Sequence, residues 1–211
     1  LKPWRRMGKD IIEAPHWCER FAIARWLNGQ PPPLTLSRGE VAVIAPRDAG
    51  ISTQAEVDML KRIGLPVKRV QARLAPVLDF LESDGCPAVH AISHGIFNLG
   101  DSDQAERWLE MANPPDEDTR EKLYPKLLNG RRLRFGRAKP LVFLNACNCG
   151  RSDFTYWGLG GWAKAFVAQA GCSAFVAPFW QVEDHRALRF AEAFYSELLK
   201  GKPIGEAMRT A

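Results

Sequence analysis

The sequence lacks the features that mark several common classes of protein. Its 211 residues contain no apolar run long enough to cross a bilayer and no signal-peptide pattern. No glycine-rich phosphate-binding loop follows any of the expected strands. No Cys-x-x-Cys pair is present to suggest zinc. These absences argue against a membrane protein, a nucleotide-binding domain and a metal site.

Cysteine is scarce and unevenly placed, with five in the whole chain. An odd number excludes complete internal pairing, and Cys147 and Cys149 lie too close in sequence for ordinary disulfide geometry. We therefore expect free thiols in a reducing compartment, which predicts a cytoplasmic protein.

The excess of positive charge is small, with a net charge of +5. Much of it comes from two runs, residues 4–9 and 131–137, and neither is interleaved with aromatic residues in a nucleic-acid-binding register. Two interpretations stay open: solvated loops, or a docking surface for an acidic partner.

The domain organisation is expected to be simple. Hydrophobic residues make up 46% of the chain and charged residues 25%, values typical of a soluble globular domain. Residues 1–38 are rich in proline and tryptophan, with a helix expected over 17–27. We interpret 1–38 as a linker or the end of a preceding domain, and 39–211 as one folded domain.

From Glu40 onward, expected strands alternate with expected helices. The strands are predicted over 41–45, 66–70, 86–93, 140–146 and 173–177. The helices are predicted over 53–62, 74–81, 159–170, 184–199 and 203–210, the first of them capped by Ser52. Residues 96–139 are expected to form a long polar insert. This alternation predicts an α/β fold with a mostly parallel sheet covered by helices on both faces.

Two short stretches span the ends of two expected strands that are consecutive along the chain. "HAISHG" ends in His94 and Gly95, and "LVFLNACNCG" presents Cys147, 53 residues after His94. In parallel sheets, functional groups gather beyond the carboxyl ends of the strands. If the two strands pair, His94 and Cys147 stand at one edge. A cysteine peptidase needs such a pair, with the thiol as nucleophile and the histidine as base and acid.

A simpler interpretation also stays open, in which Cys147 is a small buried residue and His94 a turn residue. The catalytic interpretation further requires donors for an oxyanion. The backbone N–H groups of Gly95 and Cys147 are the candidates. Gly150 would let the following loop fold back without a side chain in its path.

The order of motifs resembles the CHAT family, caspase-like cysteine peptidases of clan CD that are related to separase. The resemblance covers about residues 40–211 and rests on His94-Gly95, Ala146–Gly150, Gly158–Gly161, Ala170–Val176, Trp180–Asp184 and Phe194–Leu199. It implies a caspase-like three-layer α/β/α sandwich. Family domains continue with a further strand and a Trp-Ala segment, which we expect to lie beyond residue 211.

The resemblance also implies roles for individual residues. Cys147 matches the nucleophile and His94 the general base and acid, whereas Cys149 stands where relatives often have threonine and is given no catalytic role. The loop from Trp180 to Asp184 matches one that borders the substrate pocket. There Asp184, with Glu183 beside it, could pair with a basic P1 side chain. Asp184 could equally cap the helix that follows it.

The implied function is a cysteine endopeptidase that cleaves protein substrates through a thioester acyl-enzyme and needs no metal or other cofactor. The expected partners are a protein substrate and an attached regulatory domain, such as tetratricopeptide repeats. A nucleic-acid-guided complex is expected only as an indirect partner, and no membrane partner is expected. Relatives act in bacterial defence, so a cell-death or immune role is expected. The basic run at 131–137 is either a self-cleavage site or a solvated loop.

Two other functions compete with the peptidase. A caspase-like fold without chemistry could pass signals by contact, although the presence of both His94 and Cys147 argues against it. A nucleotide-binding receiver could use the glycine cluster at 158–161 as an anion site. That cluster begins twelve residues beyond residue 146, the end of the strand that a phosphate loop would have to follow.

Overall fold

The computed structural model describes residues 4–7, 10–13, 21–22, 24, 38–46, 53–83, 86–98, 106–113, 119–129, 131, 138–152, 154–155 and 158–211. The chain divides into two compact units. One comprises residues 27–184 and contains the main sheet. The other comprises residues 1–26 together with 185–211.

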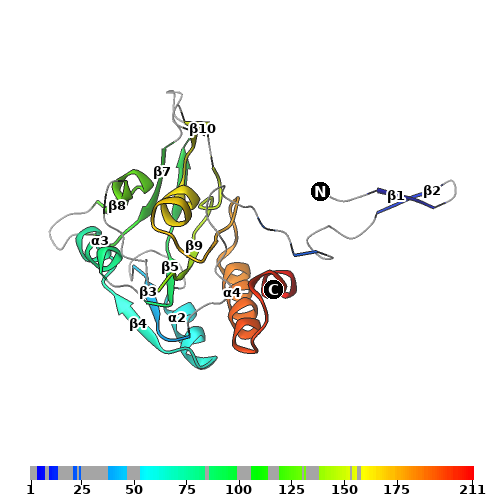
Figure 1. Cartoon of the computed structure of the whole chain (residues 1–211), viewed down its shortest axis with the longest axis horizontal. Helices are drawn as coiled ribbons and strands as arrows, with labels where there is room; N and C mark the ends of the chain where they lie inside the picture. Colours follow the sequence, from blue (N-terminus) through cyan, green and yellow to red (C-terminus); the bar gives the residue numbers. More distant parts are fainter. Residues whose placement is uncertain are drawn as a thin grey trace. The chain divides into compact units, whose positions relative to one another are not determined.

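The main sheet has five strands, all parallel, in the order β12-β9-β5-β3-β4. Its strands are β3 (Val41–Ile44), β4 (Val67–Val70), β5 (Ala88–Ile92), β9 (Leu141–Asn145) and β12 (Ala174–Val176). Figure 1 shows β3, β5 and β9 side by side in the middle of this unit. All five expected strands are confirmed, each one to three residues shorter than predicted. The central strands are nearly continuous apolar runs, as strands buried on both faces must be.

Helices cover both faces of this sheet. One face carries Ala42, Val89 and Val142, which share a core with buried residues of α3 (Leu74–Glu82) and of the helical segment that includes η2 (Lys164–Gln169). The opposite face carries His90, and α2 (Thr53–Arg62) reaches it through Glu56. The layered α/β/α arrangement is therefore present within this unit.

The helix expected over 159–170 begins later than predicted. Helical structure starts at Trp162 and becomes a π-helix over Lys164–Gln169. Upstream, β10 (Phe154–Thr155) pairs with β11 (Gly158–Leu159), which removes Leu159 from the helix. Gly161 has a φ of +103°, a conformation outside the right-handed helical region.

The insert at 96–139 is not simply a polar loop. It continues β6 (Gly95–Asn98) into a three-stranded antiparallel sheet with β7 (Glu106–Glu110) and β8 (Lys122–Leu123), followed by the short 3-10 helix η1 (Pro125–Leu128). Apolar residues lie among its charges, and Leu109, Met111, Leu123 and Leu128 join the core on the α3 face. The prediction failed because these residues are too widely spaced along the chain to form an apolar run.

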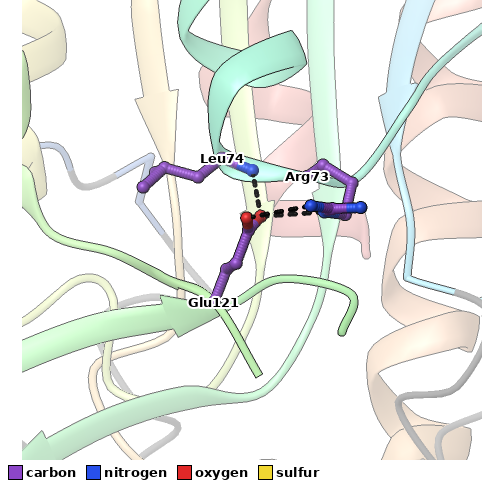
Figure 2. Close-up of polar contacts among 3 residues, drawn as sticks. All are labelled: Arg73, Leu74 and Glu121. Atoms are coloured by element: carbon purple, nitrogen blue, oxygen red, sulfur yellow. Dashed lines mark hydrogen bonds and ion pairs between the residues drawn. The ribbon is translucent and has the colours of Figure 1, made fainter. Parts of the chain in front are cut away.

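A carboxylate ties this second sheet to α3. Glu121, next to β8, accepts hydrogen bonds from the Arg73 guanidinium at 3.2 and 3.3 Å and from the Leu74 N–H at 2.5 Å (Figure 2). Partial burial alone would raise the pKa of Glu121, but these three bonds outweigh it and hold the pKa below its ordinary value. The carboxylate also faces the N-terminus of α3, where negative charge is stabilised.

The second unit contains a hairpin and two helices. The strands β1 (Trp4–Met7) and β2 (Asp10–Glu13) pair antiparallel, and neither was predicted. The helices α4 (Asp184–Leu199) and α5 (Ile204–Thr210) confirm the predicted ones. Of the helix expected over 17–27, residues 21, 22 and 24 are not helical and the others lie outside the described residues, as does Ser52.

Candidate active site

The strands that precede His94 and Cys147 are direct neighbours. β5 pairs in parallel with β9, and their last residues, Ile92 and Asn145, are partners in the register. The Ser93 N–H extends the pairing by donating to the Asn145 carbonyl at 3.4 Å. The two strands therefore pair, as the catalytic interpretation requires, and His94 and Cys147 follow them at the same edge of the sheet.

Gly95 lies against the backbone of Cys147. A Cβ atom on residue 95 would come within 2.1 Å of the Cys147 carbonyl oxygen and 3.0 Å of the Cys147 nitrogen. Real Cβ atoms do not approach backbone that closely, so only glycine fits here. This contact brings the His94-Gly95 segment to the cysteine with no room for an intervening side chain.

The strand β7 holds the His94 segment from its other side. The Glu110 N–H donates to the His94 carbonyl at 3.0 Å, and the Ser93 hydroxyl donates to the Glu110 carbonyl. His94 itself is half-buried. The insert therefore supports the histidine segment directly, a role that its polar composition does not reveal.

Cys147 sits in a tight turn that is anchored to the segment after β12. Asn148 has a φ of +61°, and its N–H donates to the Trp180 carbonyl at 3.2 Å. The Gly150 N–H donates to the Pro178 carbonyl at 2.7 Å, and a Cβ on Gly150 would come within 2.6 Å of the Ala177 carbonyl oxygen. Gly150 thus permits close packing of two backbone segments, as the sequence suggested.

The two neighbouring thiols have different surroundings. Cys147 is half-buried, and its sulfur accepts the Val182 N–H at 3.4 Å and donates to the Val182 carbonyl at 3.7 Å. Cys149 is buried, and burial raises the pKa of its thiol far above the usual range, with a further contribution from Cys147. At neutral pH Cys149 is therefore an inert thiol, and Cys147 is the better placed nucleophile.

The other described cysteines are also structural. Burial raises the pKa of Cys172 to about 12, and burial likewise raises the pKa of Cys86. None of the four described cysteines forms a disulfide.

The loop expected to border the substrate pocket lies beside the cysteine turn. Trp180 is 70% exposed, its carbonyl is bonded to the turn, and its ring packs near the exposed ring of Phe179 at 6.1 Å. Glu183 and Asp184 are exposed, and Asp184 is the first residue of α4. This position suits both interpretations of Asp184. Its carboxylate stands at the start of a helix, and it also lies two residues after Val182, whose backbone contacts the Cys147 thiol.

Several polar residues around the site were not predicted. Arg107 on β7 is buried and donates to the Arg151 carbonyl at 2.9 Å, just after the cysteine turn, and the Arg151 guanidinium lies 4.0 Å from the Phe97 ring centre. His90 and Asn145 both bond to Glu56. The signal for His90 was available, because it is a polar residue within an otherwise buried strand.

Neither a metal site nor a membrane-spanning helix is found in the part of the chain that the structure describes. Within the described ranges, no group of three or more His, Cys, Asp or Glu residues is placed to hold a metal ion. The helices in the part of the chain that the structure describes are all too short or too polar to cross a membrane.

Comparison with known proteins identifies the family of the chain. No curated protein matches the sequence. A family model described as the CHAT domain matches residues 24–211, which is most of the chain. The five-stranded parallel sheet with helices is consistent with the caspase-like fold of that family. The chain belongs to the CHAT domain family, which is related to the caspase-like peptidases of clan CD.

Proposed function

We propose that this protein is a cysteine endopeptidase that uses His94 and Cys147. The observation that carries the proposal is the contact between Gly95 and the Cys147 backbone, because it requires glycine after the histidine and places both segments at one sheet edge. Family membership supports the same reaction class.

The chemistry needs only the protein and water. His94 takes the proton from the Cys147 thiol, and the thiolate attacks the carbonyl carbon of the scissile peptide. The tetrahedral intermediate collapses to a thioester as the leaving amine receives that proton from His94. Water, deprotonated by His94, then attacks the thioester, releases the carboxylic acid and restores the thiol. The N–H groups of Gly95 and Cys147 are the proposed oxyanion donors.

The proposed substrate site lies along the loop after β12. Trp180 offers an exposed apolar surface beside the cysteine turn, and Glu183 and Asp184 offer carboxylates to a basic P1 side chain. A carboxylate recognises arginine through two parallel N–H···O bonds, which gives both affinity and directional selectivity.

The proposed setting is a cytoplasmic bacterial defence or cell-death pathway, in which an attached sensor or repeat domain switches the peptidase on. The expected partners are a protein substrate and that regulatory domain, with a nucleic-acid-guided complex acting only through it. Family membership is the support for this setting.

The competing function is a caspase-like module that signals by contact without chemistry. A covalent probe separates the two. We would treat the full-length protein with a peptidyl acyloxymethyl ketone carrying P1 arginine and locate the label by mass spectrometry. A peptidase should be labelled by the ketone at Cys147, and this labelling should be lost in His94→Ala. Iodoacetamide should still alkylate Cys147 in that variant, which would show that the thiol remains accessible. Equal labelling with and without His94 would favour the non-catalytic module.

A further inference from the structure

A buried polar cluster lies beneath the proposed active site, on the sheet face covered by α2. A single carboxyl oxygen of Glu56, Oε1, accepts the Asn145 side-chain N–H at 2.7 Å and lies 2.8 Å from His90 Nε2. Glu56 is 4% exposed and the His90 side chain is fully buried. The His90 ring also packs on Phe143, with ring centres 4.9 Å apart.

Such a cluster is costly in a core. A buried carboxyl group loses its hydration, and apolar residues of similar volume often give equal or greater stability. Stability alone is therefore a weak reason for its presence. Its placement points to a geometric role, because buried polar groups can select one arrangement of the segments that they join.

The cluster joins the two strands that carry the proposed catalytic pair. His90 is on β5, four residues before His94, and Asn145 is the last residue of β9, two residues before Cys147. Because one oxygen of Glu56 contacts both, α2 links the middle of β5 to the end of β9 from outside the sheet. The backbone bond from the Ser93 N–H to the Asn145 carbonyl joins the two strand ends directly.

A helix, and not a loop, supplies Glu56. Glu56 lies in the first turn of α2, and Thr53 in that turn makes a separate contact, because its buried hydroxyl donates to the Pro46 carbonyl at 3.3 Å, just beyond the end of β3. The carboxyl group is thus presented by a rigid element rather than by a loop. A rigid support of this kind is what a precise active-site geometry requires.

We propose that Glu56 is a positioning residue for the peptidase: it holds the Asn145 side chain and the His90 ring on one carboxyl oxygen, and so sets where the Cys147 turn leaves β9 relative to His94. This inference rests on the proposed function for its consequence in catalysis, but the geometric link can be measured without activity. The hydrogen-bond partners of Glu56 are His90 and Asn145, and Asn145 lies two residues before Cys147, so Glu56 acts through Asn145.

The test compares Glu56→Ala, Glu56→Gln and Asn145→Ala with Thr53→Val in the full-length protein. Thr53→Val is the matched control, because it removes a buried hydrogen bond from the same turn of α2 without touching β5 or β9. Glu56→Gln keeps an acceptor oxygen for Asn145 and serves as the conservative rescue.

The first readout is hydrogen exchange of the amides of Asn148 and Gly150, which bond to the Trp180 and Pro178 carbonyls. Glu56→Ala and Asn145→Ala should speed their exchange relative to Thr53→Val, and Glu56→Gln should leave it near the wild-type rate. Equal protection in Glu56→Ala and Thr53→Val would overturn the inference, whether or not the protein proves to be a peptidase.

The second readout is the kinetics of peptide cleavage. Glu56→Ala should lower kcat by about 10- to 100-fold with little change in KM, because a small displacement of the nucleophile affects the transition state more than substrate binding. Combining it with Asn145→Ala should add little further loss, since both act on one link. A wild-type protein without cleavage would refute the proposed function and leave the exchange result to decide the positioning role. A kcat loss in Thr53→Val equal to that in Glu56→Ala would overturn the positioning role, because it would reflect general loosening of α2.

Discussion

The Cα of Gly95 stands so close to Cys147 that a Cβ on residue 95 would come within 2.1 Å of the Cys147 carbonyl oxygen. We therefore expect Gly95→Ala to displace the cysteine turn and lower kcat/KM for peptide cleavage by about 100-fold or more, since misplacement of about 1 Å can cost that much. Steady-state kinetics on a cleaved peptide would measure the loss.

Gly171→Ala is the matched control for this substitution. Gly171 has a φ of +74°, so alanine there strains the backbone by about 1–2 kcal/mol, but among the described residues no atom beyond its chain neighbours lies within 4 Å of the added carbon. We expect it to lower stability and preserve activity. Equal loss of activity in both variants would mean that general destabilisation, and not the contact with Cys147, explains the effect.

The Val182 N–H is expected to make the Cys147 thiol more reactive. Proline at 182 removes this donor, whereas alanine retains it. We predict that Val182→Pro slows alkylation of Cys147 by iodoacetamide at neutral pH by about tenfold, the equivalent of one hydrogen bond to a charged group. Peptide mass mapping of alkylated protein gives the rate. Similar alkylation rates in Val182→Pro and Val182→Ala would show that the Val182 N–H does not influence the reactivity of the Cys147 sulfur.

The link between Glu121 and α3 should weaken in acid. Because the folded protein holds the pKa of Glu121 below its ordinary value, the carboxylate contributes stability that is fully present above about pH 4.3. That contribution disappears as the pH falls through the lower, folded-state pKa. Glu121→Gln should lower the free energy of unfolding by about 1 kcal/mol at pH 7 and by less near pH 3.

Urea unfolding at both pH values measures this difference. Asp79→Asn is the control, because it removes a negative charge from the exposed face of the same helix. A difference between wild type and Glu121→Gln that stays constant, or grows, toward low pH would contradict the account of this carboxylate.

The proposed P1 receptor makes a separate prediction. If Asp184 pairs with a basic side chain, Asp184→Ala should reduce cleavage after arginine and lysine by about 10-fold or more while sparing any cleavage after neutral residues. If Asp184 serves only the start of α4, the variant should lose thermal stability and keep its P1 preference. Kinetics on peptides that differ only at P1 distinguish the two roles.

The sequence predicted the main sheet and the edge where His94 and Cys147 meet, because those features follow from apolar runs and from the rule that parallel strands end together. The insert was harder to predict. The buried residues Leu109 and Leu123 are scattered among charges, and their strands form only by pairing: β7 with β6, and β8 with β7. The start of the helix at Trp162 depends on the β10–β11 pair upstream, which is a tertiary constraint.

The residues that support the site were also hard to predict from the sequence. His90 is a polar residue in a buried strand, so its involvement in a polar contact could be anticipated. Its partner could not, because Glu56 lies 34 positions earlier on a separate helix, and spacing along the chain does not indicate which strand that helix contacts. The contact of Val182 with the Cys147 sulfur is made by backbone atoms, and no side-chain pattern encodes it.

The catalytic role of Cys147 is tested most directly by a catalogue of new protein N-termini in cells that express the full-length protein under conditions that activate it. Wild type would be compared with Cys147→Ala and, as a matched control, Cys149→Ala. We predict new termini with wild type and Cys149→Ala that are absent with Cys147→Ala. The same termini in all three, or none that depends on residue 147, would contradict a peptidase built on this cysteine.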